Sequence, residues 1–182
     1  MGFLLFSGGM STVPASVQAP AVPPVPAYSV TLTAYNAVPE QTDSDPFTTA
    51  SGLYSYTEII AARSRDMADR LPFGTVIAIE GPAKHGGTCG YNVVKKLVGY
   101  RIIADTMNAR YTDRIDILFS TDANFTQVNG SQKNASHILG ICNEATIRVV
   151  GFVDIKRSNK LPKTQEALVA FIEGSTPDIA LK

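Results

Sequence analysis

The sequence has no excess of charge of either sign, because its 16 Lys and Arg residues balance its 16 Asp and Glu residues. This balance gives no electrostatic reason to expect binding to nucleic acid or to an anionic membrane surface. No apolar run approaches the roughly 20 residues that span a bilayer, so no transmembrane segment is predicted. Helical heptads are also absent, whereas Gly, Pro, Thr and β-branched residues are frequent. The 182-residue chain is therefore predicted to be all-β with short helices.

Composition divides the chain into three parts. Residues 1–27 hold no charged side chain and five of the eleven prolines, and Gly2–Met10 is a short apolar stretch. This part is predicted to be a signal-like or disordered, proline-rich leader, although it lacks the Lys or Arg with which a signal peptide normally begins. Residues 28–155 are predicted to form one domain, and residues 156–182 a linker with a short amphipathic helix.

Short strands are indicated along the predicted domain by alternating polarity or by β-branched runs. They fall at residues 29–35, 75–80, 100–104, 115–119 and 146–155, while residues 57–62 fit either a strand or the start of a helix. Short helical segments are indicated at residues 65–70, 135–142 and 163–173, with an insertion at 82–99 and a polar loop at 122–134. Five or six short strands with few helices predict a small β-barrel or sandwich.

Two aspartates accompany the two strands at the centre of this domain. Asp105 ends the first strand, and Asp116, eleven positions later, lies inside the second between Ile115 and Ile117. If the two strands lie near each other, the loop between them brings both carboxyl groups to one rim. Repulsion between two acids raises the pKa of one of them, and burial adds to this effect. A carboxyl group that keeps its proton near neutral pH meets the requirement for a general acid.

The residues around these acids resemble a known family. Asp-Thr at positions 105–106, followed by Arg-Ile-Asp at 114–116, is similar to the pattern Asp-Thr-Gly-Gly and then Arg-Ile-Asp of the three-aspartate (3D) domain. That domain is related to the MltA-like lytic transglycosylases. Further similar pieces occur at residues 33–35, 45–52 and 72–75. Met107 and Asn108 stand where the common form of the family has two glycines.

The resemblance implies a fold and an activity. It covers residues 29–153 and implies a six-stranded double-psi β-barrel in an exported protein of the periplasm, cell envelope or exterior. A groove across the barrel would hold a glycan strand of peptidoglycan. The transglycosylase members cut this strand without water or a cofactor, and they leave a 1,6-anhydro product. The family also includes cell-wall proteins, so a non-catalytic glycan-binding module is the alternative.

The resemblance also assigns roles to individual residues. Asp116 matches the catalytic acid and Asp105 a supporting aspartate, while Asp66 matches the third aspartate, with Asp69 as a competing candidate. Substrate binding is implied for Tyr35, Thr48, Thr49, Asn108 and Arg110.

The sequence allows two other interpretations of the central acids. Arg110 or Arg114 could pair with Asp116, which would lower its pKa and leave it with a structural role. The dipeptide Asp105-Thr106 also matches the first two residues of the Asp-Thr-Gly loop of aspartic proteases. Met107 replaces the glycine whose backbone conformation that loop needs, so protease chemistry is rejected.

Two cysteines, Cys89 and Cys142, allow one disulfide in an exported protein. Each lies a few residues after a histidine, His85 and His137, so a zinc site is an alternative. The mixed pairs do not have the short Cys spacing of zinc knuckles, and two free thiols are the third possibility. A disulfide would close a loop of more than fifty residues and stabilise the fold by about 4 kcal/mol.

Overall fold

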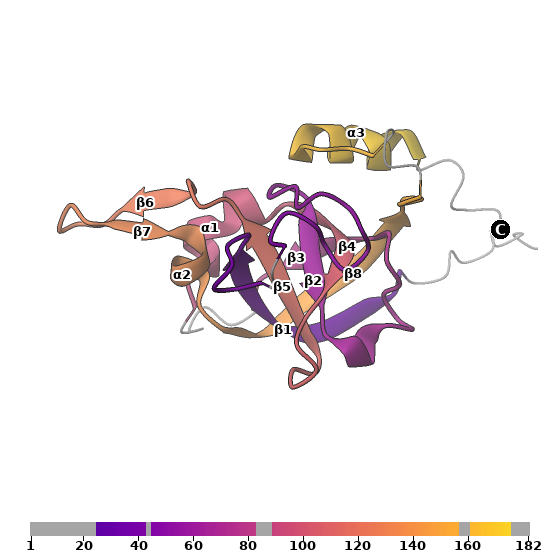
Figure 1. Ribbon diagram of the computed structural model, residues 1–182, viewed down its shortest axis with the longest axis horizontal. Coiled ribbons are helices and arrows are strands. Elements are labelled where there is room, and N and C mark those ends of the chain that lie inside the picture. The colour runs from indigo at the N-terminus through magenta and orange to yellow at the C-terminus, as the bar shows by residue number, and fades with distance from the viewer. Residues whose placement is uncertain (1–24, 43–44, 83–88, 157–160, 176–182) are drawn as a thin grey trace, which may run out of the picture.

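The computed structural model describes residues 25–42, 45–82, 89–156 and 161–175. Most of the predicted leader, and His85 of the zinc alternative, lie outside these residues. The described chain is mostly β, with a closed six-stranded barrel and a few short helices (Figure 1). The coarse prediction of a small barrel is therefore confirmed.

Six strands form the barrel, and each is hydrogen-bonded to its neighbours in a ring. In ring order they are β1 (Ala27–Asn36), β5 (Arg114–Phe119), β2 (Ile60–Arg63), β4 (Tyr100–Thr106), β3 (Thr75–Glu80) and β8 (Cys142–Phe152). The pairs β1–β5 and β2–β4 are parallel, and the other four pairs are antiparallel. The ambiguous segment at 57–62 therefore contributes a strand, β2, because the barrel buries all four of its residues.

Alternation along the strands separates two apolar clusters. Ile115 and Ile117 of β5 belong to one cluster, together with Leu32 of β1 and Ile103 of β4. Successive strand residues point to opposite faces, so Leu118 of β5 belongs to a second cluster. The first cluster fills the barrel, and the second lies on its outer face beneath the long connections. Asp116, between two inward isoleucines, therefore points outward.

Short helices and a disulfide cover one end of the barrel. Helix α1 (Tyr91–Val98) packs against α2 (Ala135–Leu139). Cys89, just before α1, is joined to Cys142 at the start of β8, with their Cα atoms 5.2 Å apart. The predicted insertion at 82–99 thus contains a helix that the sequence interpretation did not include.

A buried arginine connects α1 to the barrel. Arg101 is fully buried, and its Nε donates a hydrogen bond to the carbonyl oxygen of Val98 at 2.6 Å. Its other guanidinium nitrogens donate to the carbonyl oxygens of Leu97, Thr57 and Leu118. Burial lowers the pKa of Arg101 to about 9, so the side chain is still a cation at neutral pH.

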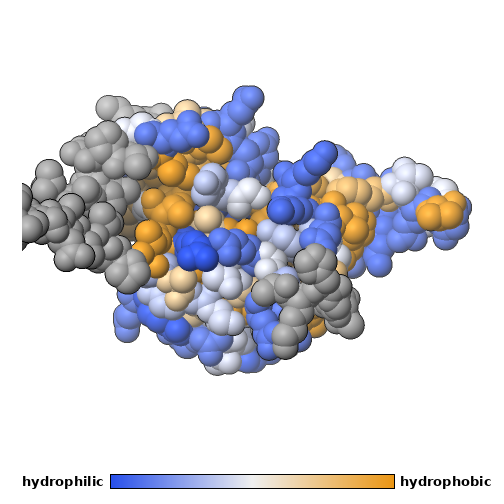
Figure 2. Space-filling model, turned by 180° about the vertical axis from the view of Figure 1, so that it is seen from behind, coloured by the Kyte–Doolittle hydropathy of each residue, from blue (hydrophilic) through white to orange (hydrophobic). Residues whose placement is uncertain are grey.

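Two further elements lie outside the barrel. The predicted polar loop at 122–134 contains a hairpin, β6 (Asn124–Thr126) and β7 (Gln132–Asn134), which projects from the barrel. Helix α3 (Gln165–Ser175) buries Leu168 against the barrel, and apolar surface gathers next to it in the view from behind (Figure 2). In the described part of the chain, every helix is too short or too polar to cross a membrane.

Candidate functional site

A row of four residues crosses the outer face of four neighbouring strands. Thr33 of β1 lies opposite Asp116 of β5, and Asp116 lies opposite Ala62 of β2. Ala62 in turn lies opposite Asp105 of β4. Directly paired residues share one face of a sheet, so both carboxyl groups point to the same side, with the small Ala62 side chain between them.

A shift in register explains why Asp105 joins this row. Ala61 of β2 pairs with Ile103, but Ala62 pairs with Asp105, so Ala104 is passed over. Without the shift, strict alternation would point Asp105 into the barrel, as Ile103 points. Bulges of this kind re-aim a side chain at functional sites.

Strand β2 lies between the strands that carry Asp105 and Asp116, and it sets the separation of their backbones. Neighbouring strands lie about 4.8 Å apart, so the backbones of Asp105 and Asp116 are separated by about 9–10 Å. Among the described residues no hydrogen bond joins the two carboxyl groups, so they influence each other by charge alone. The expectation that the two acids meet on one rim agrees with this arrangement.

Asp105 is held by three donors. Its Oδ1 accepts hydrogen bonds from the backbone N–H groups of Thr106, at 2.8 Å, and Ala50, at 2.9 Å. Its Oδ2 accepts a hydrogen bond at 2.8 Å from the hydroxyl of Tyr35, which is buried. The carboxyl group therefore anchors the connection between β1 and β2 against the end of β4.

Asp116 has a different environment. It is partly buried at the floor of a groove, and its Oδ1 accepts a hydrogen bond at 2.8 Å from Thr33 Oγ1. Burial raises the pKa of Asp116 to about 6, against the opposing influence of Thr33 and Arg114. The charge of Asp105 also raises this pKa, but as a smaller cause. The sequence argument placed repulsion first, whereas the structure makes burial the larger cause.

Asp116 forms no ion pair with any described residue. The ion pairs found among these residues involve Arg70 and Arg148, and neither Arg110 nor Arg114 lies within ion-pair distance of the Asp116 carboxyl group. The guanidinium group of Arg114 instead lies 4.5 Å from the ring centre of Tyr111. The structure therefore does not support the interpretation of Asp116 as an ion-paired structural residue.

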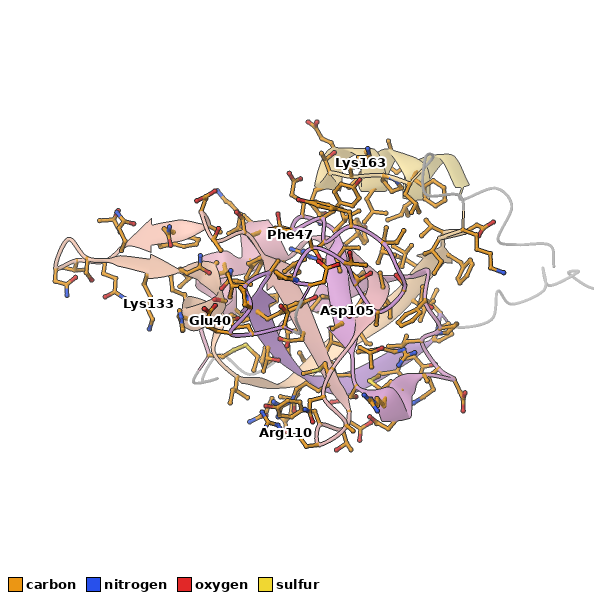
Figure 3. All side chains as sticks on the ribbon, viewed as in Figure 1. Glu40, Phe47, Asp105, Arg110, Lys133 and Lys163 are labelled. Atoms are coloured by element: carbon orange, nitrogen blue, oxygen red, sulfur yellow. A yellow bond between two sulfur atoms is a disulfide. The ribbon has the colours of Figure 1, made fainter. Side chains whose placement is uncertain are left out.

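The two aspartates lie in a groove of about 640 Å³, which we call the acid groove. Four of the five residues expected to bind substrate line it: Tyr35, Thr48, Asn108 and Arg110. Figure 3 shows Asp105 near Phe47 of the β1–β2 connection, and Arg110 on the loop between β4 and β5. Thr49 is buried beside the groove, where its Oγ1 donates a hydrogen bond to the carbonyl oxygen of Leu53 at 3.1 Å. Thr49 therefore shapes a turn.

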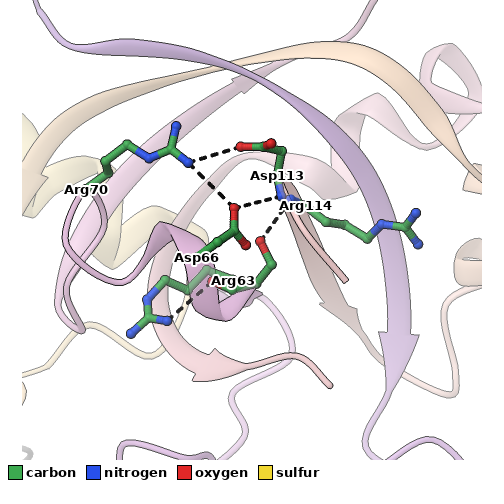
Figure 4. Close-up of polar contacts among 6 residues, drawn as sticks. Arg63, Asp66, Arg70, Asp113 and Arg114 are labelled. Atoms are coloured by element: carbon green, nitrogen blue, oxygen red, sulfur yellow. Dashed lines mark hydrogen bonds and ion pairs between the residues drawn. The ribbon is translucent and has the colours of Figure 1, made fainter. Parts of the chain in front are cut away.

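Asp66 lies outside the acid groove, in a polar cluster at the base of the β4–β5 loop (Figure 4). Its Oδ2 accepts a hydrogen bond from the backbone N–H of Asp113 at 3.0 Å and lies 3.6 Å from a nitrogen of Arg70. Hydrogen bonding, first from Ser64 and also from Asp113, lowers the pKa of Asp66. Its carboxylate fixes this loop. Asp69 is exposed and does not line the groove either.

The sequence interpretation did not single out Thr33, Ala62 or Arg65, which also line the groove. Thr33 opens the piece Thr-Ala-Tyr that carried part of the family resemblance, so its position in that piece was the available signal. The sequence around Ala62 and Arg65 carries no such signal, because their place in the groove depends on which strands pair.

The structure offers no metal site in its described residues. No group of three His, Cys, Asp or Glu side chains there is arranged to hold a metal ion. Cys89 and Cys142 are joined to each other, so neither thiol is free to bind zinc.

Comparison of the sequence with protein-family models and with curated proteins finds no match in either.

Proposed function

We propose that this protein is a lytic transglycosylase that cleaves the glycan strands of peptidoglycan, with Asp116 as its acid and base. One observation carries the proposal: a partly buried carboxyl group with a pKa raised to about 6 lies at the floor of an open groove. A group with this pKa exchanges its proton readily near neutral pH, as acid–base catalysis requires.

The proposed reaction needs one carboxyl group. Asp116 gives its proton to the glycosidic oxygen while the bond from that oxygen to the anomeric carbon breaks. The resulting carboxylate takes the proton from the 6-hydroxyl of the same sugar, whose oxygen bonds to the anomeric carbon. Asp116 is thereby protonated again, and the product is a 1,6-anhydro sugar. No water is consumed.

The state of Asp105 supports a reaction with a single acid. A retaining glycosidase uses its second carboxylate as the nucleophile, which needs a free carboxylate oxygen. Both oxygens of Asp105 already accept hydrogen bonds, so its role is to hold Tyr35 and Ala50 at the wall of the groove.

An inverting hydrolase is the competing catalytic assignment. Its two carboxyl groups are about 6.5–9.5 Å apart, and a water molecule attacks between them. Asp105 and Asp116 lie on one face on either side of β2, so this assignment uses the same two residues. The products distinguish the two reactions, because hydrolysis leaves a reducing sugar in place of the anhydro ring.

We also propose that the barrel is of the double-psi type and that the protein belongs with the 3D-domain proteins. Two parallel pairs, β1–β5 and β2–β4, within one six-stranded barrel support this proposal. Export to the cell envelope is part of it, and the Cys89–Cys142 disulfide supports export because disulfides persist in oxidising compartments.

The test is to incubate purified peptidoglycan sacculi with the protein and to analyse the soluble fragments by mass spectrometry. Fragments with 1,6-anhydro ends are expected from the wild type. Asp116→Asn should release at least about a hundredfold less, because an amide cannot supply the proton. Asp122→Asn, which removes an exposed carboxyl group, is the matched control.

The non-catalytic module remains the second candidate because of one feature. Met107 stands in the position of a glycine in the common family pattern, and its buried side chain lines the acid groove. A side chain there reduces the room for a sugar. Sacculus binding by the wild type without any release of fragments would favour this second candidate.

A further inference from the structure

The acid groove has a positively charged side that the proposed reaction does not use. Arg65, Arg110 and Arg114 line the groove together with Tyr111, and we call these four residues the arginine cluster. The guanidinium carbons of Arg110 and Arg114 lie 4.8 and 4.5 Å from the centre of the Tyr111 ring. Arg110 also donates a hydrogen bond to the Tyr111 hydroxyl at 2.8 Å. These contacts hold Arg110 and Arg114 together against the same ring.

No protein carboxylate pairs with this charge in the described part of the chain. The two acids of the polar cluster beside the loop, Asp66 and Asp113, both pair with Arg70, at 3.6 and 3.0 Å. None of the ion pairs found among the described residues includes Arg65, Arg110 or Arg114. Glu40 and Asp45 also line the groove, but no ion pair among the described residues joins either of them to the cluster, so its guanidinium groups are available to an anionic group from outside the chain.

One buried donor of the cluster lacks a partner. Arg114 Nε is buried and makes no hydrogen bond to any described residue. The corresponding atoms of Arg63 and Arg101 donate to the carbonyl oxygens of Leu71 and Val98, at 2.7 and 2.6 Å. Buried donors in folded proteins are nearly always paired. The exception leaves the Arg114 guanidinium group short of one acceptor, and because Nε itself is buried, a ligand reaches the group through its other nitrogens.

We infer that the arginine cluster binds a carboxylate carried by the glycan strand, close to the bond that is cleaved. This inference rests on the proposed function. Arg114 and Asp116 are two positions apart on the same face of β5, which places them about 6.6 Å apart along the strand. A carboxylate bound by Arg114 is therefore attached to the sugar at the cleavage site or to its neighbour.

The chemistry of peptidoglycan supplies such a group. Every second sugar carries a lactyl ether, whose carboxyl group is either free or joined to a short peptide that has carboxylates of its own. Guanidinium groups bind carboxylates through two parallel hydrogen bonds, which a neutral sugar cannot offer. The cluster thus makes the groove select acidic glycan strands over neutral strands of the same sugar rings.

Binding measurements in the Asp116→Asn background test the inference without cleavage of the ligand. Three probes are compared: glycan strands that bear peptides, strands stripped of peptide by an amidase, and a neutral chitin oligosaccharide. Arg65→Gln, Arg110→Gln and Arg114→Gln are introduced separately. Lys133→Gln, which removes one positive charge on the β6–β7 hairpin away from Arg110, is the matched control (Figure 3).

We expect the parent to bind the acidic strands at least about tenfold more tightly than the chitin oligosaccharide. Arg114→Gln should reduce this preference about tenfold and leave the affinity for the chitin oligosaccharide unchanged. The control, Lys133→Gln, should change neither the preference nor the affinity for chitin. A loss with both acidic probes identifies the lactyl carboxylate as the ligand, and a loss with peptide-bearing strands alone identifies a peptide carboxylate.

Two results would overturn the inference. If the parent binds all three probes equally, the cluster does not select a carboxylate, while the proposed glycan groove stands. The same holds if the three arginine variants weaken the acidic and neutral probes alike. If the parent binds none of the probes, the proposed function itself fails, and the inference fails with it.

Discussion

Replacing Asp116 by asparagine should stabilise the protein at neutral pH, although the change removes the proposed catalytic acid. Burial raises the pKa of Asp116 from its ordinary value of 3.8 to about 6. Between these two values the folded protein binds more protons than the unfolded chain, so the free energy of unfolding falls as pH rises. The stabilisation that comes from protonated Asp116 is fully present below a pH of about 3.8 and is lost above a pH of about 6.

The magnitude follows from the size of this pKa difference. From 3.8 to about 6, at about 1.4 kcal/mol for each pH step, the loss amounts to about 3 kcal/mol. This figure is an upper bound, because the side chain stays partly exposed to the groove and solvent screens its charge. An asparagine has the same shape, accepts the hydrogen bond from Thr33 and does not titrate. Asp116→Asn should therefore gain up to about 3 kcal/mol over the wild type at about pH 8 and almost nothing at about pH 4.

Urea unfolding followed by circular dichroism at both pH values measures this difference, with the disulfide kept intact. Comparing variant and wild type at each pH cancels the contributions of the other titrating groups. Asp122→Asn, at an exposed position, should leave the difference between the two pH values unchanged. If Asp116→Asn loses stability at about pH 8, its carboxylate is a stabilising charge, and the argument for an acid role fails.

Three further changes test the supports of the groove and the barrel. Tyr35→Phe removes the hydrogen bond to Asp105 and should lower the free energy of unfolding by about 1–2 kcal/mol; an unchanged urea midpoint would show that this bond adds nothing. Reducing the Cys89–Cys142 disulfide, whose cysteines are 53 positions apart, should destabilise by about 4 kcal/mol, and two free thiols in the unfolded, unreduced protein would refute the bond itself. Arg101→Met leaves several carbonyl oxygens unpaired and should destabilise by about 3 kcal/mol or more; a wild-type melting temperature would contradict this role.

Local patterns in the sequence predict most of the barrel strands. The alternation at 29–35 lies within β1 (Ala27–Asn36), the run at 75–80 coincides with β3 (Thr75–Glu80), and the β-branched run at 146–155 overlaps most of β8. The parallel pairing of β1 with β5 is not predictable in this way, because it joins segments far apart in the chain. Helix α1 was missed because a short segment with four apolar residues was interpreted as part of an insertion, although their spacing fits one helical face.

The candidate site was predictable in part. The spacing of Asp105 and Asp116 on two neighbouring runs indicated a common rim, and the isoleucines beside Asp116 indicated burial. The register shift opposite Ala62 carries no local signal, because it is a property of two paired strands. Asp66 was assigned from the resemblance alone, and the structure places it against Asp113, outside the residues that line the groove.

The pairing of Ala62 with both acids has a consequence for how such a protein can change over time. The distance between the backbones of the two acids is set by the width of one strand, β2, which is buried along its whole length. The connections that line much of the rest of the groove, at residues 37–42, 45–59 and 107–113, do not set this distance. Insertions and substitutions in those connections can therefore alter which ligand fits while the backbones of the acid pair keep their geometry. Part of the groove lining can thus diverge while Thr33, Arg114 and Asp116 stay fixed on the barrel strands.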